Sequence, residues 1–87
     1  MTKISWSGRA TKDLIKIPNN DRNAINKKIK NLSNYPMLVQ LDIKKLESEE
    51  NKYRLRIGNY RVLFEIQKGQ PVIIRIERIL RRTSTTY

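Results

Sequence analysis

The 87-residue sequence contains no cysteine and no histidine. The lack of cysteine excludes disulfides, thiol nucleophiles and thiolate metal sites. The lack of histidine excludes a nuclease that is built on a histidine acid–base pair. Asp and Glu number only eight, and three of the glutamates fall in the turn-like stretch ESEENK (47–52), which we expect to be a solvated loop. Catalysis by this chain would therefore depend on Arg, Lys, Tyr and at most one carboxylate.

Long apolar segments are missing as well. No apolar run is long enough to cross a membrane, and the N-terminal stretch MTKISWSGRA lacks the apolar core of a signal peptide. We therefore expect a cytoplasmic protein with no membrane partner. The hydrophobic content is 38%, and several segments have a clear apolar period, which favours a folded chain over a disordered one. The length suits a single domain, residues 1–87, with a modest core.

Positive charge dominates what is present. Nineteen Lys and Arg residues against eight Asp and Glu residues give a net charge of +11. Such a charge repels itself in the compact state and suits a polyanionic partner. A nucleic acid or an acidic protein is therefore favoured over a chain that is basic for solubility alone.

The first half of the chain predicts one strand and two helices. We expect the strand at 3–6, and Ser7 is a suitable N-cap for a helix that ends near Ile17. Asp21 is a suitable N-cap for a second helix, which ends before Pro36. The second helix has an apolar stripe with the spacing i, i+4, i+7, formed by Ile25, Ile29 and Leu32. The two helices are interpreted as an antiparallel hairpin that lies on a sheet.

The second half predicts three strands, at about 52–57, 60–67 and 72–80. Residues 37–47 are interpreted as a loop followed by a short strand at 44–46. The expected fold class is α+β with the order β-α-α-β-β-β, in which an N-terminal helical hairpin packs on a small, mostly antiparallel, twisted sheet.

The Gly58-Asn59 dipeptide fits a two-residue hairpin turn, with glycine first as a type II′ turn prefers. Such a turn sets three apolar or aromatic pairs on one face, which is suited to cover the helices: Ile57 with Tyr60, Leu55 with Val62, and Tyr53 with Phe64. The other face, called here the arginine face, then has Arg54 opposite Leu63 and Arg56 opposite Arg61. Two guanidiniums that face each other are unfavourable unless an anion lies between them.

The third strand extends the arginine face if alternate residues of this strand point to the core. Arg75 and Glu77 then lie on the arginine face, with Glu77 opposite Arg61. Arg81 lies beyond them, so that Arg56, Arg61 and Arg81 are expected to converge. One ion pair between Arg61 and Glu77 would not neutralise these three arginines, which favours an anion-binding surface over an ordinary charged one.

The order strand, helix, helix, three strands resembles the RelE/ParE superfamily of bacterial toxins over nearly the whole chain. The resemblance rests on the stretch ISWSGRATKDLIKIP (4–18), the segment Gly58-Asn59-Tyr60-Arg61 and the Arg-rich C-terminal tail that ends in Tyr87. It implies a type II toxin that is neutralised by an antitoxin encoded beside it. RelE-like members enter the ribosomal A site and cut mRNA there without metal or cofactor, using the 2′-hydroxyl of the message as the nucleophile.

By this resemblance, Arg61 would hold the scissile phosphate, Arg81 would clamp it or assist the leaving oxygen, and Tyr87 would stack on a base or help to activate the 2′-hydroxyl. The other positions expected to bind RNA phosphates are Lys52, Arg54, Arg56, Arg75 and Arg82. The RelE branch has lysines where this chain has Arg54 and Arg56, and arginine is a poor general base. The proton acceptor therefore stays unassigned.

Two other functions compete with the ribonuclease. The ParE branch has the same fold, but its toxins bind DNA gyrase and are not nucleases, and the missing histidine and the lysine-to-arginine changes favour it. A basic nucleic-acid-binding module without activity is the third possibility. The expected partners are thus a cognate antitoxin with an acidic or amphipathic segment, together with the ribosome and mRNA or, alternatively, gyrase. The converging arginines and the terminal tyrosine favour the ribonuclease.

Overall fold

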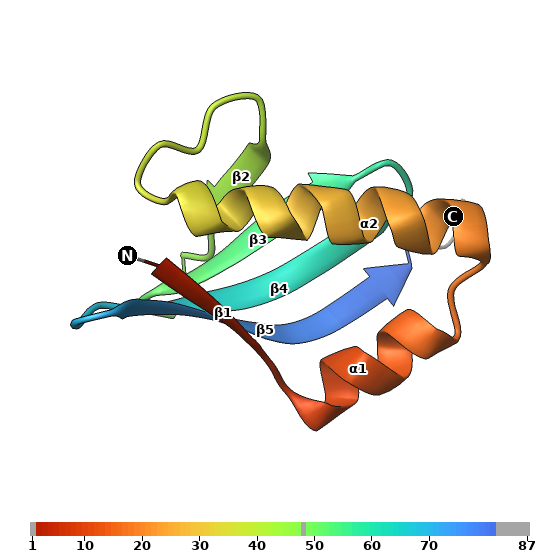
Figure 1. Cartoon of the computed structure of the whole chain (residues 1–87), viewed down its shortest axis with the longest axis horizontal. Helices are drawn as coiled ribbons and strands as arrows, with labels where there is room; N and C mark the ends of the chain where they lie inside the picture. The colour runs from red at the N-terminus through yellow and green to blue at the C-terminus, as the bar shows by residue number, and fades with distance from the viewer. Residues whose placement is uncertain (1, 48, 82–87) are drawn as a thin grey trace.

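A computed structural model of the chain describes residues 2–47 and 49–81. Its elements, in chain order, are β1 (Thr2–Trp6), α1 (Gly8–Ile15), α2 (Asn19–Asn31), the 3₁₀ helix η1 (Leu32–Asn34), β2 (Asp42–Lys45), β3 (Lys52–Ile57), β4 (Tyr60–Gln67) and β5 (Val72–Arg81). The strands form one twisted sheet in the order β1-β5-β4-β3-β2 (Figure 1). β1 runs parallel to β5, and all other neighbours are antiparallel. The predicted α+β fold is therefore confirmed.

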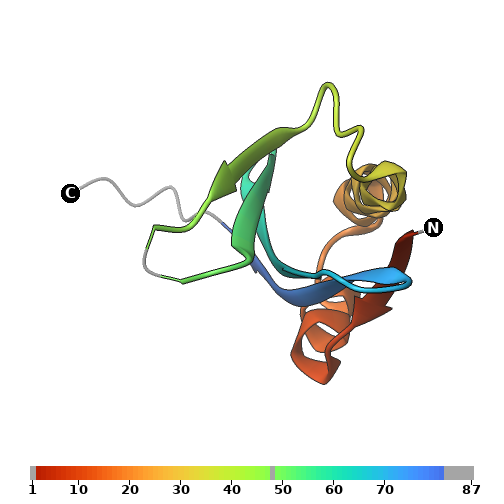
Figure 2. The same ribbon diagram turned by 90° about the vertical axis from the view of Figure 1, so that its left-hand side faces the viewer.

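Both helices lie on the same face of the sheet (Figure 2). α1 packs on β5, and α2 lies over β3. The core between the layers is formed by apolar side chains that are almost completely buried, the largest of which are Phe64, Ile25, Ile29, Leu32, Leu55, Ile74, Ile76 and Val62. The apolar stripe predicted for the second helix is thus part of the core.

The helix starts differ in how well the sequence predicts them. The Ser7 hydroxyl accepts a hydrogen bond from the Ala10 amide at 3.0 Å, as expected for the N-cap of α1. The prediction that Asp21 caps α2 is wrong, because α2 begins at Asn19 with Pro18 at the N-cap. Asp21 lies in the first turn, where its carboxylate accepts a hydrogen bond from the Tyr60 hydroxyl at 2.9 Å. No helix of the described residues is long and apolar enough to span a membrane.

The β3–β4 hairpin has the predicted register. All three apolar pairs and the pairs Arg54–Leu63 and Arg56–Arg61 are found in the ladder. Gly58 has a φ of +54°, whereas Asn59 is not among the described residues with positive φ, as a type II′ turn requires. The Tyr53 and Phe64 rings stack with their centroids 5.7 Å apart on the helix side.

The segment before β3 contains the short strand that was expected near 44–46. It forms at Asp42–Lys45 as β2 and pairs with β3 at the edge of the sheet, which raises the number of strands to five. Glu47, Glu49 and Glu50 follow it as exposed residues, as expected for a solvated loop.

The β4–β5 ladder departs from the prediction at a β-bulge. Phe64 pairs with Ile76, but Leu63 pairs with Arg78, so Glu77 is an extra residue on β5. The bulge exists because Ile79 follows Ile76 by three residues and both are buried, which strict alternation does not allow. The predictions that Glu77 lies opposite Arg61 and that Arg81 continues the arginine face are therefore wrong.

Candidate nucleic-acid interface

The face of the sheet opposite the helices carries the charged residues of β3 and β4. Beyond the bulge, Arg61 lies opposite Leu80 on β5, and Leu63 lies opposite Arg78. The side chains that share this arginine face by register include Asp42, Lys44, Lys52, Arg54, Arg56, Arg61, Leu63, Glu65, Arg75, Arg78 and Leu80. Leu63 is half-buried at the middle of this set, with Arg61 and Glu65 on either side along β4.

Arg56 and Arg61 form the cationic end of the arginine face. They lie directly opposite each other beside the turn, and both are exposed. No carboxylate of the described residues lies within ion-pair distance of either guanidinium. Asp42 is the cross-strand neighbour of Arg56, but it contacts Arg54 instead, at 3.4 Å. The predicted juxtaposition of two uncompensated arginines is thus present, and an anion is the partner that such a pair favours.

Arg54 is held at the middle of the face. One terminal nitrogen of its guanidinium contacts Asp42. Its Nε atom is buried without a hydrogen-bond partner among the described residues. The Arg54 side chain is 23% exposed. Arg54 is thus a fixed, half-buried positive charge beside Leu63.

Lys52 lies at the opposite end of the face and is fully compensated. Its Nζ atom is 2.5 Å from Glu77 Oε2 and 3.6 Å from Glu65 Oε2. The hydrogen bond to Glu77 raises the pKa of Lys52, against the opposing effect of burial. The Gln67 side chain donates a hydrogen bond to Glu65 at 2.8 Å, and this bond is the main cause that lowers the pKa of Glu65, with Lys52 adding to it. Lys52 was predicted to bind phosphate, but its ammonium is engaged by these carboxylates.

Arg81 lies on the helix side of the sheet. The ladder pairs it with Tyr60, whose ring is buried among the core residues. It lines a hollow of about 230 Å³ between α1, the start of α2 and the ends of β4 and β5, together with Asp13, Lys16, Ile17, Pro18, Tyr60 and Ile79. Arg61 and Arg81 are therefore at the same end of the sheet but on opposite faces. The predicted convergence of Arg56, Arg61 and Arg81 on one face is wrong, because the extra residue in the bulge changes which side chains at the end of β5 face the helices.

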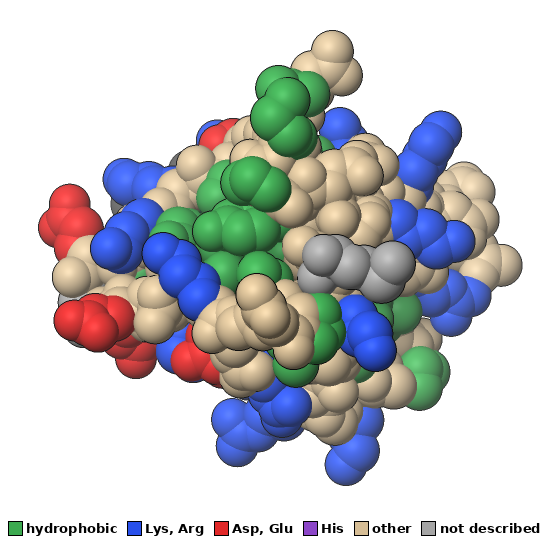
Figure 3. Space-filling view, turned by 60° about the vertical axis from the view of Figure 1, so that its left-hand side comes forward, with side chains coloured by type: hydrophobic (Ala, Val, Ile, Leu, Met, Phe, Trp, Pro, Cys, Tyr) green, Lys and Arg blue, Asp and Glu red, His purple; other side chains and the backbone are tan. Residues whose placement is uncertain are grey.

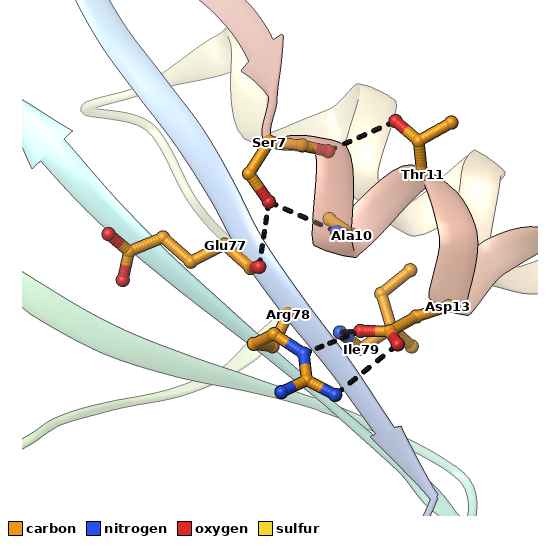
Figure 4. Close-up of polar contacts among 7 residues, drawn as sticks. All are labelled: Ser7, Ala10, Thr11, Asp13, Glu77, Arg78 and Ile79. Atoms are coloured by element: carbon orange, nitrogen blue, oxygen red, sulfur yellow. Dashed lines mark hydrogen bonds and ion pairs between the residues drawn. The ribbon is translucent and has the colours of Figure 1, made fainter.

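Helix α1 holds the bulged part of β5 in place (Figure 4). β1 pairs with β5 only as far as Ile76, so the following residues of β5 have no strand on that side. The Ser7 hydroxyl donates to the Glu77 carbonyl at 2.8 Å, and the Asp13 carboxylate accepts from the Ile79 amide at 2.9 Å. α1 thus supplies the hydrogen bonds that a neighbouring strand would have made.

Asp13 also binds the Arg78 side chain. The Arg78 guanidinium donates to both carboxylate oxygens, at 2.8 and 3.3 Å. This hydrogen bond is the main cause that lowers the pKa of Asp13, with the Ile79 amide adding to it and burial opposing it. Neither Asp13 nor Arg78 was singled out from the sequence, although the three-residue spacing of the buried isoleucines signals the irregularity that they stabilise.

The remaining predicted site residues are Arg75, Arg82 and Tyr87. Arg75 is exposed opposite Glu65 on the arginine face. Arg82 and Tyr87 lie outside the described residues. In Figure 3, Lys and Arg side chains surround an area of hydrophobic side chains, and acidic side chains gather at one side of the molecule. The visible surface is thus strongly basic away from a limited acidic area.

The fold defines a small α+β domain with a basic face, and comparisons with known proteins identify its family. The family described as "ParE toxin of type II toxin-antitoxin system, parDE" matches residues 4–85. Toxin RelE3 of Methanocaldococcus jannaschii is 37% identical over 84 residues, which cover 94% of this chain and 92% of the relative. The chain belongs to the RelE/ParE superfamily of toxins of type II toxin–antitoxin systems, as the sequence predicted.

Solved structures share the fold. The RelE chain in the RelB–RelE antitoxin–toxin complex from Methanococcus jannaschii superposes with a TM-score of 0.71 at 35% identity, covering 90% of this chain and 89% of that chain. The RelE–RelB complex from Pyrococcus horikoshii gives a TM-score of 0.78 at 22% identity, covering 97% and 98%. The second likeness supports the fold alone.

Proposed function

We propose that this toxin is a ribosome-dependent endoribonuclease that cleaves mRNA in the A site, with the message's own 2′-hydroxyl as the nucleophile. The observation that carries the proposal is the pair Arg56–Arg61, which is exposed and has no carboxylate partner among the described residues. The 37% identity to a toxin named RelE3 supports the RelE type of activity.

The reaction needs little besides charge stabilisation and proton transfer. The O2′ atom forms a bond to the adjacent phosphorus as the P–O5′ bond breaks, which leaves a 2′,3′-cyclic phosphate and a free 5′-hydroxyl. Arg61 and Arg56 hold the phosphate between them and stabilise the negative charge that builds up on its oxygens. Arg54 binds a neighbouring phosphate oxygen from the middle of the face. Arg81 contacts the RNA from the other side of the same end of the sheet.

The antitoxin is proposed to bind across this basic surface. The M. jannaschii relative of known structure is a complex of RelE with RelB. A net charge of +11 favours a partner with an acidic segment that folds on binding. Association should then be fast and should weaken with salt, which stopped-flow binding over a range of salt concentrations measures.

Gyrase inhibition is the second candidate, and two observations favour it. The matching family carries the ParE description. The bulge also places Arg81 on the opposite face from Arg56 and Arg61, so the described residues lack the cluster of three arginines that favoured the ribonuclease. A gyrase inhibitor would arrest growth with intact messages and induced DNA damage.

Controlled expression with mapping of mRNA 5′ ends on ribosomes tests the proposal. Wild type should produce new ends inside A-site codons, and Arg61→Ala should lower their yield at least about 100-fold, because a donor to the charged phosphate is lost. Arg9→Ala, which removes an exposed arginine from α1, is the matched control and should cleave like wild type. Growth arrest without new ends would reject the ribonuclease.

A further inference from the structure

The ribonuclease reaction requires a base for the 2′-hydroxyl proton, and most groups on the arginine face are unsuited to this role. Arginines keep their protons at any physiological pH. Lys52 is held in its protonated form, since Glu77 raises its pKa. Tyr60 lies on the helix side, where burial and the bond to Asp21 raise its pKa. The candidates left in the described part of this face are the carboxylates of Asp42, Glu65 and Glu77.

Geometry separates these three carboxylates. Asp42 is 58% exposed on the edge strand and contacts Arg54. Glu65 accepts a hydrogen bond from Gln67 and lies opposite Arg75, and its pKa is lowered, which makes it a weaker base. Glu77 has a single described side-chain partner, Lys52.

The Glu77 side chain lies on the arginine face by the same alternation that buries Ile74 and Ile76, and the β-bulge then allows Ile79 to be buried as well. Bulges re-aim side chains and occur beside active sites. Ser7 holds the Glu77 carbonyl from the α1 side, and the Glu77 side chain points away from α1, whereas that of Arg78 turns towards Asp13 (Figure 4). Without the extra residue, the strand could not bury Ile79 and place Glu77 beside Lys52 at the same time.

The Lys52–Glu77 pair borders the same central residue as the arginines. Leu63 has Arg54 directly across on β3 and Arg61 two residues away along β4. Lys52 is the diagonal neighbour of Leu63 on the other side, opposite Glu65. A ribose and phosphate over Leu63 would therefore lie between guanidiniums on one side and the Glu77 carboxylate on the other.

We infer that Glu77 is the catalytic base of the proposed ribonuclease, an inference that rests on that function. The Glu77 carboxylate takes the proton of the 2′-hydroxyl as O2′ bonds to phosphorus. The P–O5′ bond breaks, and the departing O5′ takes a proton from water. Lys52 is a positioning residue, because its ammonium holds the Glu77 carboxylate on the arginine face. The other charged groups around Glu77 are Glu65 on β4, Arg75 and Arg78 on β5, and Asp13 on α1.

Single-turnover cleavage of mRNA in the A site of purified ribosomes, over a pH series, tests this role. Glu77→Gln should cleave about 10²–10⁴-fold more slowly than wild type and lose the fall in rate towards acid pH. Glu65→Gln removes a charge that also contacts Lys52, and it is the matched control that should stay within a few-fold of wild type. Cooperative unfolding and ribosome binding should be unchanged in both variants.

Lys52→Met provides an independent readout if Glu77→Gln fails to fold. Lys52→Met leaves the Glu77 carboxylate without its described side-chain partner, so cleavage should slow at least about 10-fold, and Lys52→Arg, which keeps a donor to Glu77, should restore most of the rate. Glu77→Gln with the wild-type rate and pH profile, or Lys52→Met with the wild-type rate, would overturn the inference while the ribonuclease stands. Absence of cleavage by wild type would remove the ribonuclease itself and the inference with it.

Discussion

The two ends of the arginine face use charge in opposite ways. At the turn end, Arg56 faces Arg61, and no described carboxylate compensates them. At the far end, Lys52 contacts both Glu65 and Glu77. The same two strands thus carry an electrostatically unfavourable pair and a neutralised cluster about 13 Å apart along β3.

This difference indicates which end of the arginine face serves stability and which end serves binding. A protein that needed only a stable sheet would pair its cross-strand charges, as the Lys52 end does. The turn end keeps two like charges side by side at a cost in stability, which an anionic ligand would relieve. We therefore propose that the uncompensated end binds the phosphate and that the compensated end supplies the proton acceptor.

A charge reversal at Arg56 should have the largest effect, because it removes the uncompensated charge at the turn end of the arginine face. Arg56→Glu places a carboxylate opposite Arg61 and converts the turn end into an ion pair. Cleavage should fall at least about 100-fold, whereas the free energy of unfolding should change by less than about 0.5 kcal/mol, because the pair with Arg61 becomes attractive while the pair with Asp42 becomes repulsive. Ribosome cleavage assays and urea unfolding measure the two effects. Lys68→Glu, with the same change of charge in the exposed β4–β5 turn, should change neither strongly, and an equal loss there would contradict the role of the pair.

Two arginine–aspartate pairs should differ in how much each contributes to the free energy of unfolding. Asp13→Asn weakens the bonds from Arg78 and from the Ile79 amide, and it should lower the free energy of unfolding at neutral pH by about 1–2 kcal/mol. Asp42→Asn removes one long contact at an exposed site, and its effect should stay below about 0.5 kcal/mol. Equal losses in urea unfolding would contradict the role given to α1.

The Asp13 effect should depend on pH. Because the folded state lowers the pKa of Asp13, its contribution is present above the ordinary carboxyl value of 3.8 and is lost as the pH falls through the lower folded value. The difference in unfolding free energy between wild type and Asp13→Asn should therefore shrink in acid below about pH 4. Urea titrations at neutral and acid pH measure this, and a difference that stays constant would rule out Asp13 as its source.

A smaller effect than that of Asp13→Asn is expected at the start of α1. Ser7→Ala removes both the N-cap and the bond to the Glu77 carbonyl, and it should cost about 1 kcal/mol in unfolding free energy. Ser33→Ala, which removes a bond to the Lys30 carbonyl at an exposed helix end, is the control and should cost less than about 0.5 kcal/mol. A larger loss at Ser33 than at Ser7 would contradict the picture of α1 as the support of the bulge.

Most of the fold follows from local patterns in the sequence. The Ser7 cap, the stripe of Ile25 and Ile29, and the Gly58-Asn59 turn are read from neighbouring residues, and all are confirmed. The turn also determines that Arg56 meets Arg61, since a two-residue loop leaves one register for the hairpin. The roles of Arg61, Arg81 and Tyr87 in catalysis stay predictions.

Only the tertiary structure decided where β5 changes face. Strict alternation predicted Arg81 beside Arg61, but burial of Ile79 requires an extra residue, and α1 satisfies the backbone groups that the bulge exposes. Ser7 and Asp13 are some seventy residues away from β5 in the chain. Pairing between the two strands of a tight hairpin is set by its turn, whereas a strand that returns beside a distant helix takes the register in which both its apolar side chains and its unpaired backbone groups find partners.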